Sequence, residues 1–105
     1  MKTTSLYIED RHLEMVREVI KIHYPNAKVV AYGSRVDGDD RTAHEGSDLD
    51  LAVVDFGDSG LGGNISLLRD AFSKSNIPFL IDIFDYNKLP KNFKEEINKK
   101  NFLIL

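Results

Sequence analysis

The first apolar residues of the chain recur with the period of an α-helix. The stripe that they form comprises Leu13, Val16, Val19, Ile20 and Ile22. Residues at this spacing lie on one face of a helix, which is then buried against the rest of the fold. We predict a helix over residues 9–23 that ends before Pro25, because proline disfavours helical backbone in the residue that precedes it.

Two short segments with the alternation of β-strands follow this helix. The first strand is predicted over residues 27–32 and stops at Gly33. A short helical turn over residues 34–38 and a polar loop over residues 39–47 lead to the second strand, residues 48–54. That strand begins with alternating acidic and apolar residues, and this alternation predicts one polar side and one side that faces the core.

The second half of the chain adds two helices and a third strand. A glycine-rich connection over residues 57–63 leads to a helix over residues 65–75 and then to an apolar strand over residues 78–84. A last helix is predicted over residues 91–100. The tail over residues 102–105 is too apolar to be freely solvated, so we expect it to dock on the domain or on a partner.

The order of these elements predicts an α/β (α+β) fold. We expect a small mixed β-sheet of three or four strands, with helices packed mainly on one face. One domain is expected over residues 1–105, because a chain of this length holds a single modest core. We expect no membrane association, since no apolar run approaches a bilayer span and the N-terminus has no signal-peptide-like stretch.

Charge and composition exclude several classes of partner and chemistry. A net charge of −3 gives no general attraction to nucleic acid, so direct nucleic-acid binding is not expected. The absence of cysteine excludes disulfides, thiolate metal sites and cysteine nucleophiles, and it suits a reducing cytoplasm. Acidic residues are concentrated between residues 35 and 58, and this stretch should attract cations.

The strongest chemical signal is a pair of aspartates at the start of the second strand. Asp48 and Asp50 lie two residues apart, so their carboxylates share one face while Leu49 and Leu51 face the core. Two neighbouring carboxylates repel each other unless a cation lies between them, and Mg²⁺ binds through one or two carboxylates together with substrate phosphates. The turn at Gly33 and Ser34 can supply N–H groups and a hydroxyl for those phosphates.

Asp82 is the candidate third carboxylate, because it lies within the apolar third strand. An unpaired charge inside such a strand is unfavourable, and a shared metal ion would stabilise it. With Asp48 and Asp50 it forms a set able to hold two ions, and it is the natural residue to lie beside the acceptor hydroxyl. Asp85 is the alternative third ligand, but we expect it to cap the turn that follows the strand.

These residues together resemble the signature of the DNA polymerase beta-like nucleotidyltransferase superfamily. That signature is a Gly-Ser pair, a spacer, an Asp-x-Asp motif and a later strand aspartate. The runs GSRVDG and SDLDLAV are similar to those of its smallest branch, the minimal nucleotidyltransferases. Members of this branch are often encoded beside a helical HEPN-domain protein as a toxin–antitoxin pair.

The resemblance implies a role for each motif residue. Gly33 and Ser34 would bind the nucleotide phosphates. The implied metal ligands and catalytic residues are Asp48, Asp50 and Asp82. Arg35 matches the arginine of the motif and is assigned to nucleotide binding, with contact to a partner or a surface salt bridge as the alternatives. Asp37 departs from the pattern, because many relatives carry a basic residue there.

Our leading hypothesis is a Mg²⁺-dependent nucleotidyltransferase that transfers AMP from ATP to a hydroxyl of a protein. Two Mg²⁺ ions are expected, with Mn²⁺ as a substitute. By resemblance the acceptor is a HEPN-domain toxin, which makes this chain the antitoxin. Two alternatives stay open: a non-catalytic module that neutralises its partner by contact alone, and a stand-alone transferase for a small molecule. The sequence does not choose between homo- and hetero-oligomers.

Overall fold

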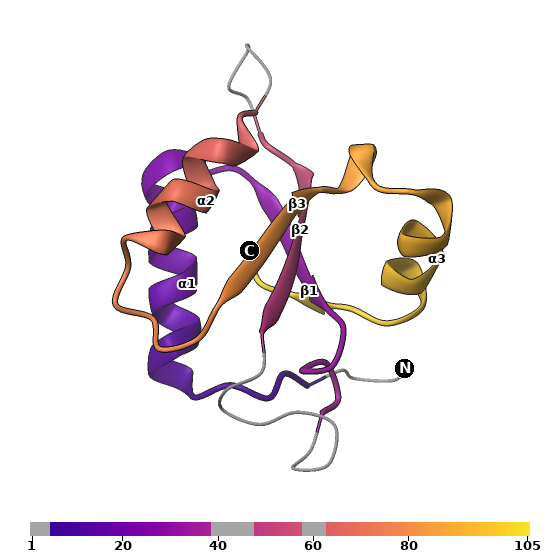
Figure 1. Ribbon diagram of the computed structural model, residues 1–105, viewed down its shortest axis with the longest axis horizontal. Coiled ribbons are helices and arrows are strands. Elements are labelled where there is room, and N and C mark those ends of the chain that lie inside the picture. Colours follow the sequence, from indigo (N-terminus) through magenta and orange to yellow (C-terminus); the bar gives the residue numbers. More distant parts are fainter. Residues whose placement is uncertain (1–4, 39–47, 58–62) are drawn as a thin grey trace.

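The computed structural model describes residues 5–38, 48–57 and 63–105, and Figure 1 shows the arrangement of its elements. The elements in chain order are α1 (Asp10–His23), β1 (Lys28–Tyr32), β2 (Leu49–Asp55), α2 (Ile65–Ser73), β3 (Ile81–Asp85), the 3₁₀ turn η1 (Tyr86–Lys88), α3 (Lys91–Lys99) and β4 (Phe102–Leu103). The predicted loop over residues 39–47 and residues 58–62 of the glycine-rich connection lie outside the described residues.

Within the described residues, four strands form one mixed sheet in the order β3-β2-β1-β4. Strand β1 pairs antiparallel with both β2 and β4, whereas β2 and β3 are parallel. The predicted mixed sheet is therefore confirmed. The apolar tail docks on the domain as β4, and the next residue, Ile104, is only 2% exposed.

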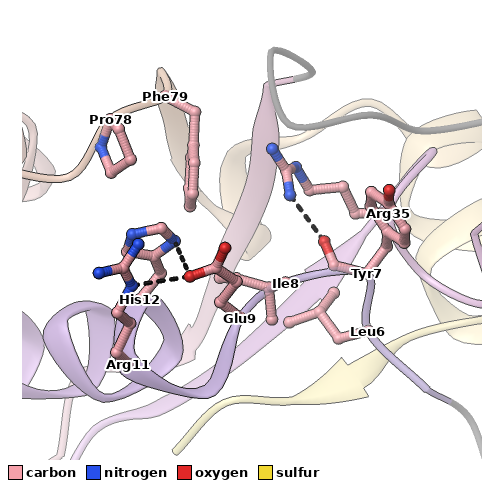
Figure 2. Close-up of a pocket in the computed structure, with 9 residues that line it drawn as sticks. All are labelled: Leu6, Tyr7, Ile8, Glu9, Arg11, His12, Arg35, Pro78 and Phe79. Carbon is pink, nitrogen blue, oxygen red and sulfur yellow. Dashed lines mark hydrogen bonds and ion pairs between the residues drawn. The ribbon is translucent and has the colours of Figure 1, made fainter. Parts of the chain in front are cut away.

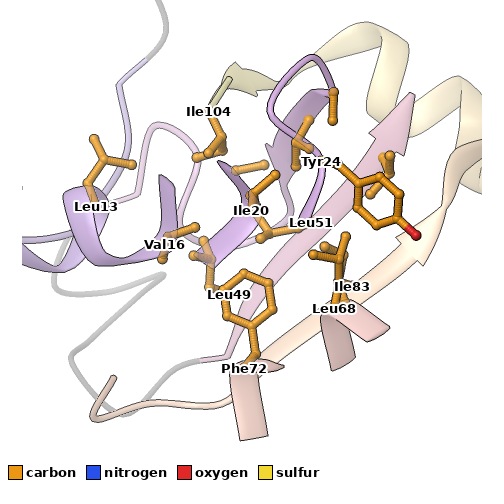
Figure 3. Close-up of a cluster of buried hydrophobic side chains, with 14 of the residues drawn as sticks. Leu13, Val16, Ile20, Tyr24, Leu49, Leu51, Leu68, Phe72, Ile83 and Ile104 are labelled. Atoms are coloured by element: carbon orange, nitrogen blue, oxygen red, sulfur yellow. The ribbon is translucent and has the colours of Figure 1, made fainter. Parts of the chain in front are cut away.

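Helices α1 and α2 cover one face of the sheet and enclose the main core (Figure 1). Their contribution to this core comes from Leu13, Val16, Ile20, Leu68 and Phe72. The sheet contributes Leu49, Leu51 and Val53, which are all fully buried, as the alternation in the sequence predicts (Figure 3). Asn64 begins α2 as its N-cap, because its side chain accepts a hydrogen bond from the Ser66 N–H at 2.9 Å.

Helix α3 lies on the opposite face of the sheet (Figure 1). Its buried residue Ile97 packs against Val30 and Ala52, which are cross-strand neighbours. Two of the three helices thus share one face, as expected. Among the described helices, none is long and apolar enough to cross a membrane.

Strand β3 begins at Ile81 rather than at residue 78. Pro78 has no N–H to contribute to a ladder, and the first hydrogen bond to β2 is made by Leu80, whose carbonyl accepts from the Leu49 N–H at 2.9 Å. Phe79 is half-buried and packs against the main core. The start of β3 is therefore fixed by its pairing with the start of β2.

Candidate active site

The expected acidic residues lie at one end of the sheet, where β1 finishes and β2 and β3 begin. Asp50 of β2 lies opposite Tyr32 of β1 on one side and opposite Asp82 of β3 on the other. Residues in cross-strand register project from the same face of a sheet. Tyr32, Asp50 and Asp82 therefore form one row across three strands, on the face that also carries α3. We call this the acidic row.

Helix α3 packs on the neighbouring row, and Tyr32 lies at the edge of that apolar cluster. The next row along the same face contains Val30, Ala52 and Phe84, and the first two pack against Ile97 of α3. In the acidic row, Asp82 is exposed and Asp50 is half-buried. The face of the sheet is thus apolar and covered under α3 but acidic and accessible at its end.

Asp48 extends the acidic row toward the solvent. It is exposed, precedes β2 and lies two residues before Asp50, so the alternation of strand side chains directs it to the same face. All three expected carboxylates are thus on one face at one end of the sheet.

The electrostatics of the row match this arrangement. Burial, together with the neighbouring carboxylates of Asp82 and Asp48, raises the pKa of Asp50 to about 6. Burial also raises the pKa of Tyr32 to about 12, and the charges of Asp50 and Asp82 add to this effect. Each negative group makes the ionisation of the next one less favourable, so the row favours a bound cation.

Gly33 is required at the end of β1 because its backbone passes directly beside Asp50. Its φ is +85°, and a Cβ placed there would lie 2.6 Å from Oδ2 of Asp50. A side chain at this position would therefore meet both backbone strain and a steric clash. Sequence reasoning linked this glycine to phosphate binding, whereas the structure shows a close approach to a carboxylate. Ser34, which follows, is exposed.

The carboxylates of Asp48, Asp50 and Asp82 have the chemistry to bind a hard cation, but their oxygens do not converge on one position that an ion could occupy. Within the part of the chain that the structure describes, no three histidine, aspartate or glutamate side chains come close enough together to hold a metal ion as they stand. Carboxylate oxygens are nevertheless the ligands that Mg²⁺ and Ca²⁺ prefer. Burial raises the pKa of Asp50, and the nearby negative charges of Asp82 and Asp48 add to this effect. The assignment of Asp48, Asp50 and Asp82 as metal ligands stays a prediction.

Arg35, the third expected nucleotide-binding residue, has its side chain buried. It is 2% exposed, and its guanidinium lies over the ring of Phe79, with Cζ 4.3 Å from the ring centroid. Its Nη1 donates a hydrogen bond to the carbonyl of Tyr7 at 2.6 Å. Figure 2 shows this pair in a cavity of about 680 Å³, between the segment that leads into α1 and the segment that leads into β3. The nucleotide-binding role of Arg35 stays a prediction.

Asp37 has a structural contact that sequence reasoning did not find. Its carboxylate accepts a hydrogen bond from the Ser5 N–H at 2.8 Å, and its own N–H donates to the Ser5 carbonyl at 2.8 Å. The residue has a positive φ of 53°, which aspartate tolerates better than most side chains. The available signal was the Asp-Gly pair at a turn, but nothing in the sequence identifies Ser5 as its partner.

Asp85, the alternative third ligand, is a capping residue as expected. Its Oδ1 accepts a hydrogen bond from the Asn87 N–H at 3.0 Å, at the start of the turn η1. Asp82 is therefore the aspartate of β3 that lies in register with Asp50.

Comparison with known proteins agrees with this geometry. Residues 14–105 match the family described as "Polymerase beta, Nucleotidyltransferase". The chain belongs to this nucleotidyltransferase family. It is also 33% identical over 95 residues to "Probable protein adenylyltransferase MntA" of Haemophilus influenzae, an alignment that covers 90% of this chain and 80% of the relative. The resemblance to the polymerase beta-like minimal nucleotidyltransferases is thereby confirmed, and the chain is an enzyme of the nucleotidyltransferase class.

The raised pKa of Asp50 predicts a pH dependence for the metal-free nucleotidyltransferase. An aspartate in an unfolded chain titrates near about 3.9, whereas folded Asp50 titrates near about 6. The folded state therefore binds the proton more tightly, and this contribution to stability is lost as the pH rises from about 4 through about 6. Asn at this position has no carboxyl to titrate, so Asp50→Asn does not lose stability in this way. The free energy of unfolding of the variant minus that of the wild type should therefore rise between pH about 4 and about 6.

Urea denaturation of metal-free protein at several pH values measures this difference. Glu18→Gln is the matched control, because it replaces an exposed carboxyl on α1, and its difference from wild type should stay constant. A constant difference for Asp50→Asn as well would contradict the assignment of the shift to Asp50.

The contact between Gly33 and Asp50 predicts a coupling between two substitutions. Gly33→Ala should lower the free energy of unfolding by about 1–3 kcal/mol, through the positive φ and the clash with the carboxylate. In an Asp50→Ala background only the backbone strain should remain, so Gly33→Ala should be less destabilising there. A double-mutant cycle in urea measures the coupling. Additive effects of the two substitutions would show that the alanine Cβ does not meet Asp50.

Proposed function

We propose that this chain transfers AMP from ATP to a hydroxyl of a partner protein in a Mg²⁺-dependent reaction. The observation that carries the proposal is the register of β2 and β3, which sets Asp50 beside Asp82 at an accessible end of the sheet. Further support comes from the family to which the chain belongs and from the printed name of its Haemophilus influenzae relative, a probable protein adenylyltransferase.

The proposed division of labour follows the positions of the side chains. Asp48, Asp50 and Asp82 would hold two Mg²⁺ ions, for which Mn²⁺ could substitute. When bound, these ions lower the pKa of the attacking hydroxyl and neutralise negative charge on the leaving pyrophosphate. The turn at Gly33 and Ser34 offers backbone N–H groups and a hydroxyl to the triphosphate.

The transfer itself exchanges one P–O bond for another. The acceptor oxygen forms a bond to the α-phosphorus of ATP, and the bond from that phosphorus to the β-phosphate bridging oxygen breaks, which releases pyrophosphate. Asp82 is proposed to lie beside the acceptor and to take its proton, because it is the exposed carboxylate on the edge strand of the row. Asp50 is more enclosed and is proposed to orient the nucleotide.

The acceptor is proposed to be a protein of the HEPN class, with this chain as the cytoplasmic antitoxin of the pair. The carboxylates would bind metal and nucleotide, but the described residues include no second domain or groove beside them that could bind an acceptor. We therefore propose that the partner completes the site. Positioning and charge neutralisation are sufficient for phosphoryl transfer, so a small domain can perform it once the acceptor is held in place.

The aspartates separate catalysis from neutralisation by contact. Asp48→Asn and Asp50→Asn should abolish the rise in melting temperature that Mg²⁺-ATP gives the wild type through preferential binding to the folded state. Asp82→Asn should still bind Mg²⁺-ATP but should transfer AMP about 100-fold more slowly, the scale on which loss of one transition-state stabilising group acts. Asp70→Asn on the exposed face of α2 is the control and should behave like wild type.

The assay is transfer of label from α-labelled ATP to the co-purified HEPN-domain protein, read beside growth of cells that express both. Absence of transfer by the wild type would contradict the enzymatic proposal. Should Asp82→Asn protect cells as well as the wild type does, contact inhibition replaces catalysis as the mechanism of neutralisation.

A further inference from the structure

Arg35 directly follows the Gly33–Ser34 turn, and its side chain is buried. Among the described residues no other charged residue is buried. Burying a cation is unfavourable unless hydrogen bonds and neighbouring groups compensate for the loss of water. Here the guanidinium lies 4.3 Å from the centroid of the Phe79 ring and donates to the Tyr7 carbonyl at 2.6 Å (Figure 2). A cation–π contact is stronger when it is removed from water, as it is here.

The backbone of Arg35 is anchored as firmly as its side chain. Its carbonyl accepts a hydrogen bond from the Tyr7 N–H at 2.7 Å, and Val36 forms an antiparallel bridge with Leu6. The Val36 N–H in turn donates to the Gly33 carbonyl at 3.1 Å, which closes the turn that contains Ser34. A displacement of Arg35 would therefore move this turn directly.

Phe79, the other residue of the contact, is connected to the aspartates through the backbone. Phe79 is followed by Leu80, whose carbonyl accepts a hydrogen bond from Leu49. Leu49 lies between Asp48 and Asp50, and the half-buried Phe79 packs against the main core, which lies on the face opposite these carboxylates. The contact of Arg35 with Phe79 thus connects the Gly33–Ser34 turn with the starts of β2 and β3. It does so on the face of the sheet opposite Asp50 and Asp82.

We propose that the Arg35–Phe79 contact is a clamp that sets the distance between the Gly33–Ser34 turn and the aspartates, and that Arg35 is a positioning residue for the nucleotide. The proposal rests on the proposed function for the identity of the ligand that the turn and the aspartates share. Groups that act together on one substrate must be held within about 0.5 Å of their productive geometry. The turn is already joined to β2 through β1, whose last residue Tyr32 pairs with Asp50. The clamp adds a second connection, from the turn to the segment that leads into β3 and Asp82.

Variants of both partners separate positioning from direct contact with phosphate. Phe79→Leu removes the ring but leaves Arg35 in place, and Arg35→Lys keeps the charge but loses the planar stack. Both should raise the dissociation constant for Mg²⁺-ATP about tenfold, which corresponds to about 1.4 kcal/mol. The double variant should be little weaker than either single variant, and Phe79→Tyr, which keeps an aromatic face, should restore wild-type affinity.

Isothermal titration with Mg²⁺-ATP, at a temperature well below the melting point of every variant, measures these affinities. Arg11→Ala is the matched control, since this arginine lines the same cavity but pairs with Glu9 at the surface and should not affect binding. Wild-type affinity in Phe79→Leu together with a loss in Arg35→Lys would overturn the clamp and show direct contact with the nucleotide. Wild-type affinity in both would overturn any role of the pair.

Amide hydrogen exchange tests the clamp independently of nucleotide. In Phe79→Leu, exchange of the Val36 amide should accelerate about tenfold relative to the amides of α3, although Val36 belongs to the turn and not to β3. Unchanged exchange at Val36 would overturn the coupling between the two segments. If the wild type itself does not bind Mg²⁺-ATP, the proposed function fails while the exchange measurement still decides the clamp.

Discussion

The parallel pairing of β2 with β3 is the constraint on which the rest of the site depends. Its register places Asp50 opposite Asp82 and, on the other face, buries Leu51 and Ile83 in the core. A slip of one residue would send the leucines to the solvent and the aspartates into the core. The burial of apolar side chains on one face of the sheet therefore fixes the spacing of the carboxylates on the other.

This arrangement places several negative charges close together at the accessible end of the sheet, where they do not stabilise the fold. Burial and the charge of Asp82 oppose the ionisation of Asp50, and the backbone beside this carboxylate leaves no room for a side chain at Gly33. Such local conflict is tolerated because a large apolar core on the opposite face holds the strands in place. A bound cation converts the conflict into an attraction, so the same residues that destabilise the empty site would stabilise the loaded one.

The sequence predicts most of the elements and the acidic face but not the contacts beneath it. Alternation from Asp48 to Val53 is a local signal and correctly assigns the two faces of β2. The burial of Arg35 and the pairing of Asp37 with Ser5 depend on residues distant in sequence, so no periodicity reveals them. For the same reason the sequence could not show that Asp50 is the group that requires Gly33.

The row formed by Asp50 and Asp82 is the proposed meeting point of divalent metal and nucleotide. Addition of Mn²⁺ with ATP to isotope-labelled protein broadens the amide resonances nearest the ion, and two-dimensional NMR identifies them. The account predicts the strongest broadening at Gly33, Asp50 and Asp82, with α2 little affected. Broadening centred elsewhere, for example on the cavity beside Phe79, would contradict it.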